Sequence, residues 1–577
     1  MSNARPRLMS TTRSGLRGSC GAQLAGLAVA VAVAVANVIV ASALAGCGGG
    51  DNQPQVDAGL PDAAAPRVSV RILAFNDFHG TLDLPTGSQA TMYGPPTGGV
   101  SYLATHLAAA RQAQPHTVVV SVGDLFGASA SLSRIFHDEP TVEAMALVGL
   151  DVAGLGNHEF DRGLTELRRM VSGGCHPVDG CQDGTGYQGA PFSLVSTNVW
   201  DPARGQTLFA PYVVRSFDGV RVAFLATVPP WTPTIVGAAD LGGLEVRDDV
   251  SALNATVTEL RAQGIEAFVV LAHMGGSGGG GPDDCPAPSA ELATFVTGLD
   301  PAVDVVLGGH SHEAYSCRVG AVVATSAGSR GQVFTDLGLT VDRASGDVTQ
   351  VTVANRLVTR DVPPAAAVEA LLSHYHDLAT PILRGVVGRI TASLTREPSP
   401  GGDCSLGSVV ADGMLEATRG ARAEVAIIHQ ASLRSDLRYL RYGAETEDGQ
   451  ITLLETMNVL PYGDSLVTLD LSGDELVATL DQQGFSVAGL EYTWDGQLPA
   501  GARIELASFL IGGVPVVLDR LYRVTVNDYL LRGGDGYAAF VAGRHAEVGV
   551  GDVEAFASYL GAHSPVTPPP ARITRRK

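Results

Sequence analysis

Apolar, β-branched segments alternate with helical patterns in this 577-residue chain, and this alternation strongly constrains the fold. The apolar segments read VSVRILAF, HTVVVSVGD, RVAFLATV, EAFVVLAH and VDVVLGGH. Helical patterns such as those at 101–112 and 141–150 lie between them. Strands that alternate with helices predict a layered α/β domain, which we place at residues 68–355.

A second region with a different pattern follows this domain. Residues 356–383 contain Leu371, Leu372, Tyr375 and Leu378 at helical spacing, and we interpret the segment as a linker helix. Residues 384–562 mix helical sequence (LGSVVADGMLEATRG) with strand-like sequence (SLVTLDL, LYRVTVND). They predict a second domain of the α/β or α+β type, followed by a Pro-rich tail at 563–577.

The N-terminal segment has the order of regions found in a secretion signal. Four arginines precede an uncharged apolar stretch at about 24–44, and LAGC follows. The stretch is long enough for a retained transmembrane helix, but the small residues before Cys47 resemble the lipobox of bacterial lipoproteins. We therefore expect residues 1–46 to be a signal peptide, Cys47 to carry lipid, and 47–67 to form a flexible tether. The protein would then be lipid-anchored in the bacterial cell envelope, with no other contact to membrane.

The charge of the chain restricts its partners. Its 38 basic and 59 acidic residues give a net charge of −21, and loss of the four leader arginines would make this −25. Like charges repel, so the charge disfavours nucleic acid polymers and anionic membrane surfaces as partners. An anionic small molecule would need a strong local positive centre, such as bound metal.

The cysteines fit an oxidising compartment. Cys175 could pair with Cys181, and Cys285 with Cys317, which leaves Cys404 without a partner. No CxxC pair is present in the sequence, so zinc held by thiolates is not supported.

Polar residues follow the apolar segments of the first domain. They occur in FNDFHG, SVGDLFG, GLGNHEFD, VLAHMG and VLGGHSHE. In open α/β sheets the carboxyl ends of the strands face the ligand-binding crevice, so five separate segments would deliver oxygen and imidazole ligands to one place. Such ligands suit Zn²⁺, Mn²⁺, Fe²⁺ or Co²⁺, and one shared carboxylate would allow two ions. A lone Asp or His at a strand end is usually a helix cap or a surface residue, whereas five coincident strand ends favour a two-metal site.

The set DxH, GDxxxG, GNHEFD, AHxG and GHSH, in this order, resembles the calcineurin-type metallophosphoesterases. Over about 68–562 the chain is similar to the two-domain bacterial 5′-nucleotidase and UDP-sugar hydrolase family. The resemblance implies a four-layer α/β/β/α sandwich followed by a 5′-nucleotidase C-terminal domain. It also implies two divalent ions (Zn, Mn, Co, Fe or Mg). Their ligands would be Asp77, His79, Asp124 and His312 for one ion and Asp124, Asn157, His273 and His310 for the other.

The resemblance also assigns the remaining site residues. His158, oriented by Asp161, would stabilise charge on the phosphoryl group or protonate the leaving oxygen. Tyr462 and Tyr529 would enclose a nucleobase, and Asp535 would accept a hydrogen bond from the ribose hydroxyls.

Two segments of the second domain depart from the family pattern. HQASLR stands where the family shows NGGxxR, and only Arg434 is kept as a substrate contact. DCSLGS stands where the family often shows E-[ST]-x-L-G-N, so Asp403 and Ser408 replace its glutamate and asparagine. These departures concern the identity of the nucleotide and leave the hydrolase class untouched.

We therefore expect a monomeric, metal-dependent phosphoric ester hydrolase of the 5′-nucleotidase type. Its partner would be a nucleotide or another small phosphate ester. The alternatives are the same metal centre acting on UDP-sugars, 2′,3′-cyclic nucleotides or a sulfur ester, and a surface lipoprotein that binds ligands without turnover.

Overall fold

A computed structural model describes residues 67–85, 90–234, 236, 241–443, 445–531, 533 and 537–576. The expected signal peptide, Cys47, nearly all of the tether and Asp535 lie outside these residues. Among the described residues, no helix combines the length and apolarity needed to cross a bilayer.

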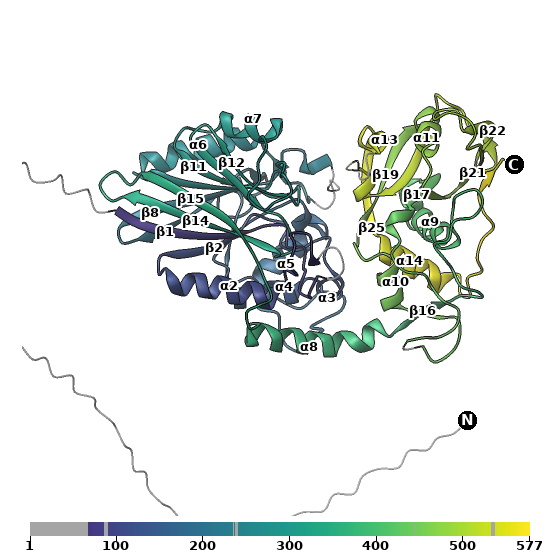
Figure 1. Ribbon diagram of the computed structural model, residues 1–577, viewed down its shortest axis with the longest axis horizontal. Helices are drawn as coiled ribbons and strands as arrows, with labels where there is room; N and C mark the ends of the chain where they lie inside the picture. The colour runs from purple at the N-terminus through teal and green to yellow at the C-terminus, as the bar shows by residue number, and fades with distance from the viewer. Residues whose placement is uncertain are drawn as a thin grey trace, which may run out of the picture. The chain divides into compact units, whose positions relative to one another are not determined.

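Two mixed six-stranded sheets form the centre of the first domain (Figure 1). One has the order β15-β14-β1-β2-β3-β4 and the other β12-β13-β11-β10-β8-β7. The first sheet consists of β1 (Arg67–Phe75), β2 (Thr117–Ser121), β3 (Val152–Gly154), β4 (Ser193–Val195), β14 (Val333–Asp342) and β15 (Val348–Leu357). The second consists of β7 (Tyr212–Phe217), β8 (Val220–Thr227), β10 (Ala267–Ala272), β11 (Val303–Leu307), β12 (Ala314–Val319) and β13 (Val322–Ala327).

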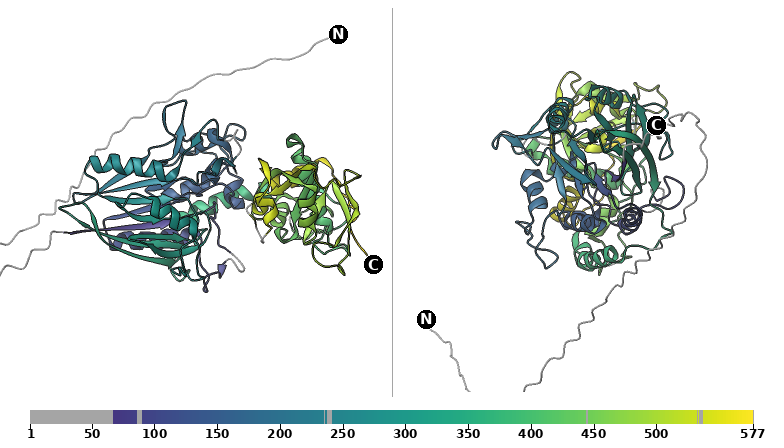
Figure 2. Two further views of the ribbon diagram at one scale, coloured as in Figure 1. Left: turned by 90° about the horizontal axis from the view of Figure 1, so that it is seen from above. Right: turned by 90° about the vertical axis from the view of Figure 1, so that its left-hand side faces the viewer.

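Three apolar clusters hold these sheets and their helices in four layers. In β1, Val70 and Ile72 pack between the sheets, whereas Leu73 and Phe75 face the helices on the outer side. This alternation follows from the two-residue period of a strand. The helices on that side are α2 (Val100–Ala113), α3 (Ser131–Arg134), α4 (Glu139–Val148), α5 (Gly163–Ser172) and α8 (Ala366–Leu383). The other sheet is covered by α6 (Asp249–Ala262) and α7 (Ala290–Gly298). The layers confirm the predicted α/β/β/α sandwich, which Figure 2 shows from two further directions.

The helix α8 follows the first domain and packs against it. Leu372 and Tyr375 belong to the same apolar cluster as α2 and α4, and the Tyr375 hydroxyl donates to Glu143 Oε2 over 3.0 Å. The helical spacing of the leucines thus marks the face that is buried.

The second domain contains a five-stranded sheet and a four-stranded sheet, in the orders β20-β17-β24-β19-β25 and β23-β22-β21-β26. The five strands are β17 (Val425–His429), β19 (Ser465–Ser472), β20 (Phe485–Ala488), β24 (Leu521–Asn527) and β25 (Arg544–Gly551). The four are β21 (Leu490–Trp494), β22 (Ile504–Ile511), β23 (Val514–Pro515) and β26 (Ile573–Arg575). Its longer helices are α9 (Ser405–Ala417), α10 (Leu453–Val459), α11 (Gly473–Leu480) and α14 (Asp552–Ala562).

The C-terminal residues differ from the interpretation of 563–577 as a tail. Ile573 is 2% exposed, and β26 pairs in parallel with β21. The Arg572 side chain bonds to both oxygens of Asp412 at 2.7 Å. A three-residue strand behind a Pro-rich run carries too little pattern to be seen in sequence, and its partner lies some 80 residues earlier.

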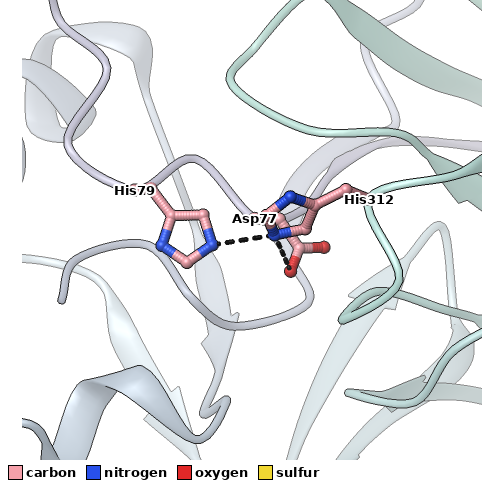
Figure 3. Close-up of side chains that lie close together, drawn as sticks. All are labelled: Asp77, His79 and His312. Carbon is pink, nitrogen blue, oxygen red and sulfur yellow. Dashed lines mark hydrogen bonds and ion pairs between the residues drawn. The ribbon is translucent and has the colours of Figure 1, made fainter. Parts of the chain in front are cut away.

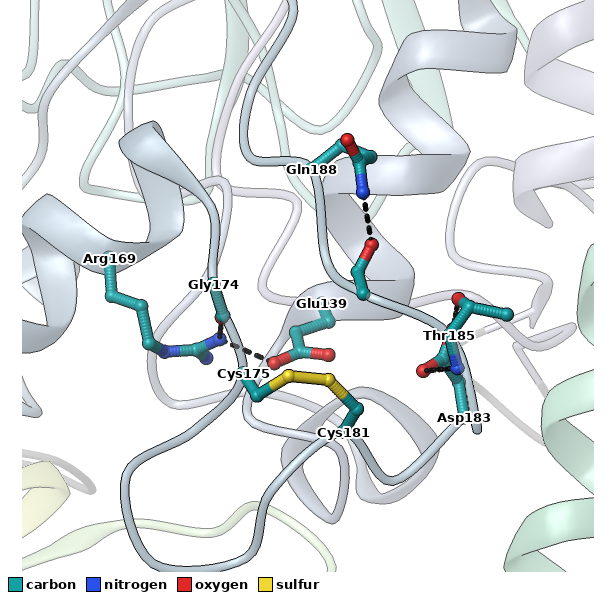
Figure 4. The surroundings of a disulfide bond; sticks show 9 residues. Glu139, Arg169, Gly174, Cys175, Cys181, Asp183, Thr185 and Gln188 are labelled. Atoms are coloured by element: carbon teal, nitrogen blue, oxygen red, sulfur yellow. Dashed lines mark hydrogen bonds and ion pairs between the residues drawn. A yellow bond between two sulfur atoms is a disulfide. The ribbon is translucent and has the colours of Figure 1, made fainter.

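Both expected disulfides are present. Cys175 pairs with Cys181 in a short loop after α5, and Cys285 pairs with Cys317 (Figure 4 shows the first). Cys404 is buried with a free thiol, and its Sγ accepts the Gly407 N–H over 3.3 Å at the start of α9. The odd cysteine therefore serves as a helix cap.

Candidate metal centre

The ends of five strands deliver the polar residues to one place. β1, β2 and β3 run parallel in one sheet, and β10 and β11 run parallel in the other. Asp77 and His79 follow β1, Asp124 follows β2, and Asn157 follows β3. His273 follows β10 directly, and His310 and His312 follow β11. Each side chain thus comes from the end at which parallel strands share an edge.

Asp77, His79 and His312 form the first cluster of candidate ligands (Figure 3). One donor atom from each lies within 4.8 Å of the others. His79 Nε2 is 3.0 Å from His312 Nε2, and His312 Nε2 is 3.5 Å from Asp77 Oδ1. Two imidazoles and one carboxylate that converge in this way offer a three-donor set for a divalent ion.

Asp124, His273 and His310 form the second cluster. His273 Nε2 lies 3.0 Å from Asp124 Oδ2, and His310 Nδ1 lies 3.0 Å from Asn157 Oδ1. Asp124 Oδ2 is also 3.7 Å from His79 Nε2 of the first cluster. Asp124 therefore faces both clusters, as a shared ligand would.

Hydrogen bonds to the backbone fix the tautomers of two histidines. His79 Nδ1 lies 2.8 Å from the Gly127 carbonyl, and His273 Nδ1 lies 3.0 Å from the Val122 carbonyl. A carbonyl only accepts, so each Nδ1 carries the proton and each Nε2 presents its lone pair to the cluster. This arrangement is typical of metal-binding histidines.

Asp77 is held by neighbours on three segments. Asn76 donates to its Oδ2 over 2.6 Å, and the His310 backbone N–H donates to the same carboxylate over 2.9 Å. Asn76 in turn accepts the Ala327 N–H and donates to Gly328 O. These bonds connect the loops after β1, β11 and β13 and orient a carboxylate that is fully buried.

Glu159 connects the loop after β2 to the loop after β3. Its buried carboxylate accepts the backbone N–H groups of Asp124 (3.0 Å), Leu125 (2.7 Å) and Gly156 (2.6 Å). The resemblance assigns this residue no role, although it lies inside GNHEFD between His158 and Asp161. Its position in that motif was the only available signal.

Five of the seven candidate ligands have left-handed backbone conformations. The φ angles are 48° for Asp77, 49° for His79, 48° for Asp124, 68° for His310 and 59° for His312. Such conformations are uncommon outside glycine, and they persist where the surrounding structure imposes them. Contacts with the surrounding structure, and not local backbone preference, therefore impose the conformations that place these side chains.

Two glycines allow the loops to approach the ligands. A Cβ at Gly156 would lie 2.1 Å from Asp124 Oδ1 and 2.7 Å from His273 Cε1. A Cβ at Gly309 would lie 3.0 Å from Asp77 Oδ2. The first contact is impossible and the second is tight, so the glycine of GNHEFD is required by close packing around the second cluster.

The buried charges of the centre call for a cation. Burial, with a contribution from the neighbouring Asp124, raises the pKa of Asp77 to about 7 against the lowering effect of His273. Burial lowers the pKa of His79 to about 3. Burial also lowers the pKa of His273, but Asp124, Asp77 and Glu159 outweigh it and raise the value to about 9. Without metal, a proton on His273 thus compensates the carboxylates, a role that a divalent ion would take over.

The donors fit divalent metal. His273 Nε2 is fully buried, and the Asp124 Oδ2 atom of the candidate shared ligand lies 3.0 Å from it. A buried imidazole nitrogen that faces carboxylate and amide oxygens belongs to the kind of donor set that Zn²⁺, Mn²⁺ or Fe²⁺ prefers. Together the two clusters support bound divalent metals without specifying the element.

His137, Glu166 and His176 form a third group of donors. Their donor atoms already have partners within the protein. His137 Nδ1 accepts from Arg162, and its Nε2 bonds to Asp179 over 2.7 Å. Glu166 is bound by the Arg169 guanidinium. Both ring nitrogens of His137 are already occupied, so we assign no metal to this group.

His158 and Asp161 lie beside the first cluster. His158 Nδ1 is 2.9 Å from Asp161 Oδ2, which also accepts the Ala128 N–H. The His158 ring centroid is 5.2 Å from that of His79, and its backbone N–H donates to Asp124 Oδ1 over 2.9 Å. Asp161 therefore fixes the orientation of the imidazole at the edge of the metal centre.

A cavity of about 400 Å³ opens over the first cluster and reaches the second domain. His79, His158 and His312 line it together with Arg434, Tyr462 and Tyr529, which the sequence analysis assigned to substrate. Further lining residues, which the sequence analysis did not single out, are Ala128, Arg330, Ala431, Ser432, Asp464 and Asp528. The candidate substrate contacts and the candidate metal ligands thus share one cavity.

The two segments that depart from the family pattern, HQASLR and DCSLGS, lie differently with respect to this cavity. Ala431 and Ser432 of HQASLR line it. Asp403 of DCSLGS instead accepts the Arg572 backbone N–H over 2.7 Å, and Ser408 O accepts from the Arg572 side chain. In the described part of the chain, DCSLGS therefore anchors the C-terminal strand and does not line the cavity.

Comparisons with known proteins agree with this architecture. Residues 70–314 match the family model of calcineurin-like phosphoesterases, and 386–542 match that of the 5′-nucleotidase C-terminal domain. The endonuclease YhcR of Bacillus subtilis is 28% identical over 86% of this chain, which spans 40% of that protein's length. The cell wall protein Lmo0130 of Listeria monocytogenes is 29% identical over 86% of this chain and 68% of its own. The crystal structure of a 5′-nucleotidase precursor from Thermus thermophilus covers 88% of this chain and 99% of its own, with 26% identity and a TM-score of 0.55.

Proposed function

Because this chain belongs to the calcineurin-like metallophosphoesterases that carry a 5′-nucleotidase C-terminal domain, we propose that it is a metal-dependent hydrolase releasing phosphate from nucleotides. One observation carries the proposal. The cavity that exposes His79, His158 and His312 also exposes two tyrosines and an arginine of the second domain. A nucleotide would use both sides of this cavity, the first-domain side for its phosphate and the second-domain side for its nucleoside.

The seven donors would hold two divalent ions. Asp77, His79 and His312 would hold one, Asn157, His273 and His310 the other, and Asp124 both. Such ions supply Lewis acidity, which lowers the pKa of water and neutralises charge on a phosphate. This also explains how a chain with a net charge of −21 accepts an anion.

His158 would act on the leaving group. Asp161 holds its Nδ1 proton, so Nε2 is the atom that can donate to the ester oxygen that leaves phosphorus. The short bond to Asp161 also stabilises the protonated imidazole before donation. Asp161 is thus a positioning residue and His158 the proton donor.

The second domain would bind the nucleoside. Tyr462 and Tyr529 offer aromatic faces on which a base can stack, and such stacking contributes about 1–3 kcal/mol. The Arg434 guanidinium lies 5.6 Å from the Tyr462 ring centroid and steadies that ring. Asp535 remains our candidate for the ribose hydroxyls.

We place the protein in the cell envelope, held by lipid at Cys47. The leader and lipobox-like sequence support this location, as do the two disulfides, which persist in oxidising compartments. A monomer remains our expectation.

A substrate panel combined with metal analysis tests the proposal. Purified protein loaded with Mn²⁺ or Zn²⁺ should bind close to two ions per chain and release phosphate from AMP. The panel should include UDP-glucose, 2′,3′-cyclic AMP and bis-p-nitrophenyl phosphate, which would reveal a different ester as substrate. Two bound ions with no turnover on any substrate would instead indicate a ligand-binding lipoprotein.

A further inference from the structure

Arg330 is a cation in the catalytic cavity that the mechanism above does not use. It follows β13 and lines the cavity beside His79 and His312. Its charge acts on His79 of the first cluster, and Tyr462 and Asp464 of the second domain act on its charge in turn. Arg330 therefore shares one cavity with residues of the first metal cluster and with the tyrosines that we assign to the base.

The backbone presents Arg330 in a fixed position. Its φ angle is 57°, and its N–H donates to Asp77 O over 2.8 Å. Two residues earlier, Gly328 O accepts from Asn76, which orients Asp77. The loop that carries Arg330 is thus built into the hydrogen bonds of the first metal cluster, at the cost of a left-handed backbone.

The Arg330 guanidinium has no side-chain or backbone partner in the described part of the chain. Throughout the described residues it makes no hydrogen bond, and no carboxylate oxygen lies within 4.0 Å of it. Arg434, the other arginine of the cavity, differs because it donates to Ala431 O over 3.3 Å and lies over the Tyr462 ring. The five donors of this half-buried arginine are therefore left for solvent or for a ligand that supplies acceptors.

We propose that Arg330 forms a second anion subsite, which binds a phosphate group adjacent to the one that the metals hold. This inference rests on the proposed phosphohydrolase function and adds a specificity-determining residue to it. Guanidinium is suited to the task because its donors match phosphate oxygens in pairs.

The position of the subsite indicates the substrate class. In a nucleoside monophosphate, the neutral ribose lies between the metal-held phosphate and the stacked base, and it offers no charge to Arg330. In a nucleoside diphosphate or nucleotide sugar, a second phosphate lies there. The cavity should therefore favour substrates in which two phosphates precede the nucleoside.

Kinetics with ADP and AMP test the subsite. The variants are Arg330→Met, which removes the charge, Arg330→Lys, which keeps it without the paired donors, and Arg419→Met at an exposed surface pair as control. We expect wild type to favour ADP. Arg330→Met should lower kcat/KM for ADP at least tenfold, mainly through KM, and that for AMP less than threefold. Arg330→Lys should recover part of the loss, and Arg419→Met should match wild type.

Two outcomes would overturn the proposal. Equal losses on ADP and AMP would show that Arg330 acts on the scissile phosphate or on the Asp77 loop, and unchanged kinetics would show that it binds no anion. Calorimetric binding of the non-hydrolysable α,β-methylene-ADP by metal-loaded protein separates this inference from the proposed function. Even if the protein turns over no substrate, the Arg330→Met variant should bind α,β-methylene-ADP more weakly than wild type if the subsite exists. Equal binding by the two proteins would reject the subsite.

Discussion

Asp124 contacts both candidate metal clusters and the backbone that carries the candidate proton donor. Its Oδ2 faces His273 and His79, and its Oδ1 accepts the His158 N–H. The first cluster, the second cluster and the backbone of His158 therefore all contact the Asp124 carboxylate. At the scale of single residues, the centre depends on such shared contacts, so substitutions should separate into those that remove metal and those that leave it bound.

Replacing His158 by alanine should leave the metals bound and slow the chemistry. Loss of a positioned proton donor typically costs about 10²–10⁴-fold. We expect kcat for AMP to fall by about 10² or more. With p-nitrophenyl phosphate the loss should be much smaller, because that leaving group departs without a proton. Asp161→Asn should give an intermediate loss on AMP. Equal losses on both substrates, or a change in metal content, would contradict the assignment.

Replacing Gly156 by alanine should disturb the second cluster. The added Cβ would lie 2.1 Å from Asp124 Oδ1, so the carboxylate or the loop must shift. We expect fewer than two ions per chain by elemental analysis and a matching loss of turnover. Gly420→Ala is the control, because a Cβ there meets nothing within 4 Å. Full metal content in Gly156→Ala would show that the loop can relax without cost.

Among the elements, β11 combines a site-forming end with a half-buried acid near its start. Its C-terminal end leads to His310 and His312, whereas Asp304 near its start accepts the Phe268 N–H over 2.9 Å. Burial raises the pKa of Asp304 to about 7, against the lowering effect of that hydrogen bond. The strand therefore carries an ionisable group whose charged form the fold disfavours.

Asp304 makes stability depend on pH. The folded state holds its proton more tightly than the unfolded state, so the protein should lose stability as pH rises from about 4 to about 7. The full effect is at most about 4 kcal/mol, since one pKa unit corresponds to 1.36 kcal/mol. Asp304→Asn keeps the acceptor for Phe268 and should be more stable than wild type at pH 8, with little difference at pH 4. Urea unfolding at both values measures this. Asp519→Asn, at an exposed position, is the matched control for the substitution.

For the whole molecule, metal content should control the stability of the first domain. The centre buries Asp77, Asp124 and Glu159 together, which only a cation can compensate fully. Metal bound to the folded state alone adds stability according to its concentration and affinity. The two-domain cavity should also form its complete phosphate site only when the ions are bound.

Chelation should lower the melting temperature, and added Mn²⁺ or Zn²⁺ should restore it. The difference between metal-loaded and metal-free protein should be larger at pH 8 than at pH 5.5. Above the pKa of about 7, Asp77 is charged, so metal binds better and the metal-free centre is strained. Differential scanning calorimetry measures both states. Asp124→Asn should abolish the metal response, and a melting temperature insensitive to chelator would reject a metal-stabilised centre.

The sequence by itself indicated the layered fold and the chemistry of the centre. Polar residues directly after apolar strands can be located from the sequence, because the end of a strand fixes where the next two or three side chains can lie. GNHEFD therefore pointed to Asn157, His158 and Asp161 before any contact was known. The helical spacing in α8 indicated its buried face for the same reason.

Tertiary structure alone decided the features that depend on distant pairs. Glu159 joins two loops through backbone N–H groups, which no side-chain pattern reveals. Asp403 binds Arg572, nearly 170 residues later, and β26 pairs with β21 across a Pro-rich run. That no described residue pairs with the Arg330 guanidinium depends on which distant segments pack around it. Local spacing determines which donors a strand end offers, whereas packing between distant segments determines which of them meet and which are left for a ligand.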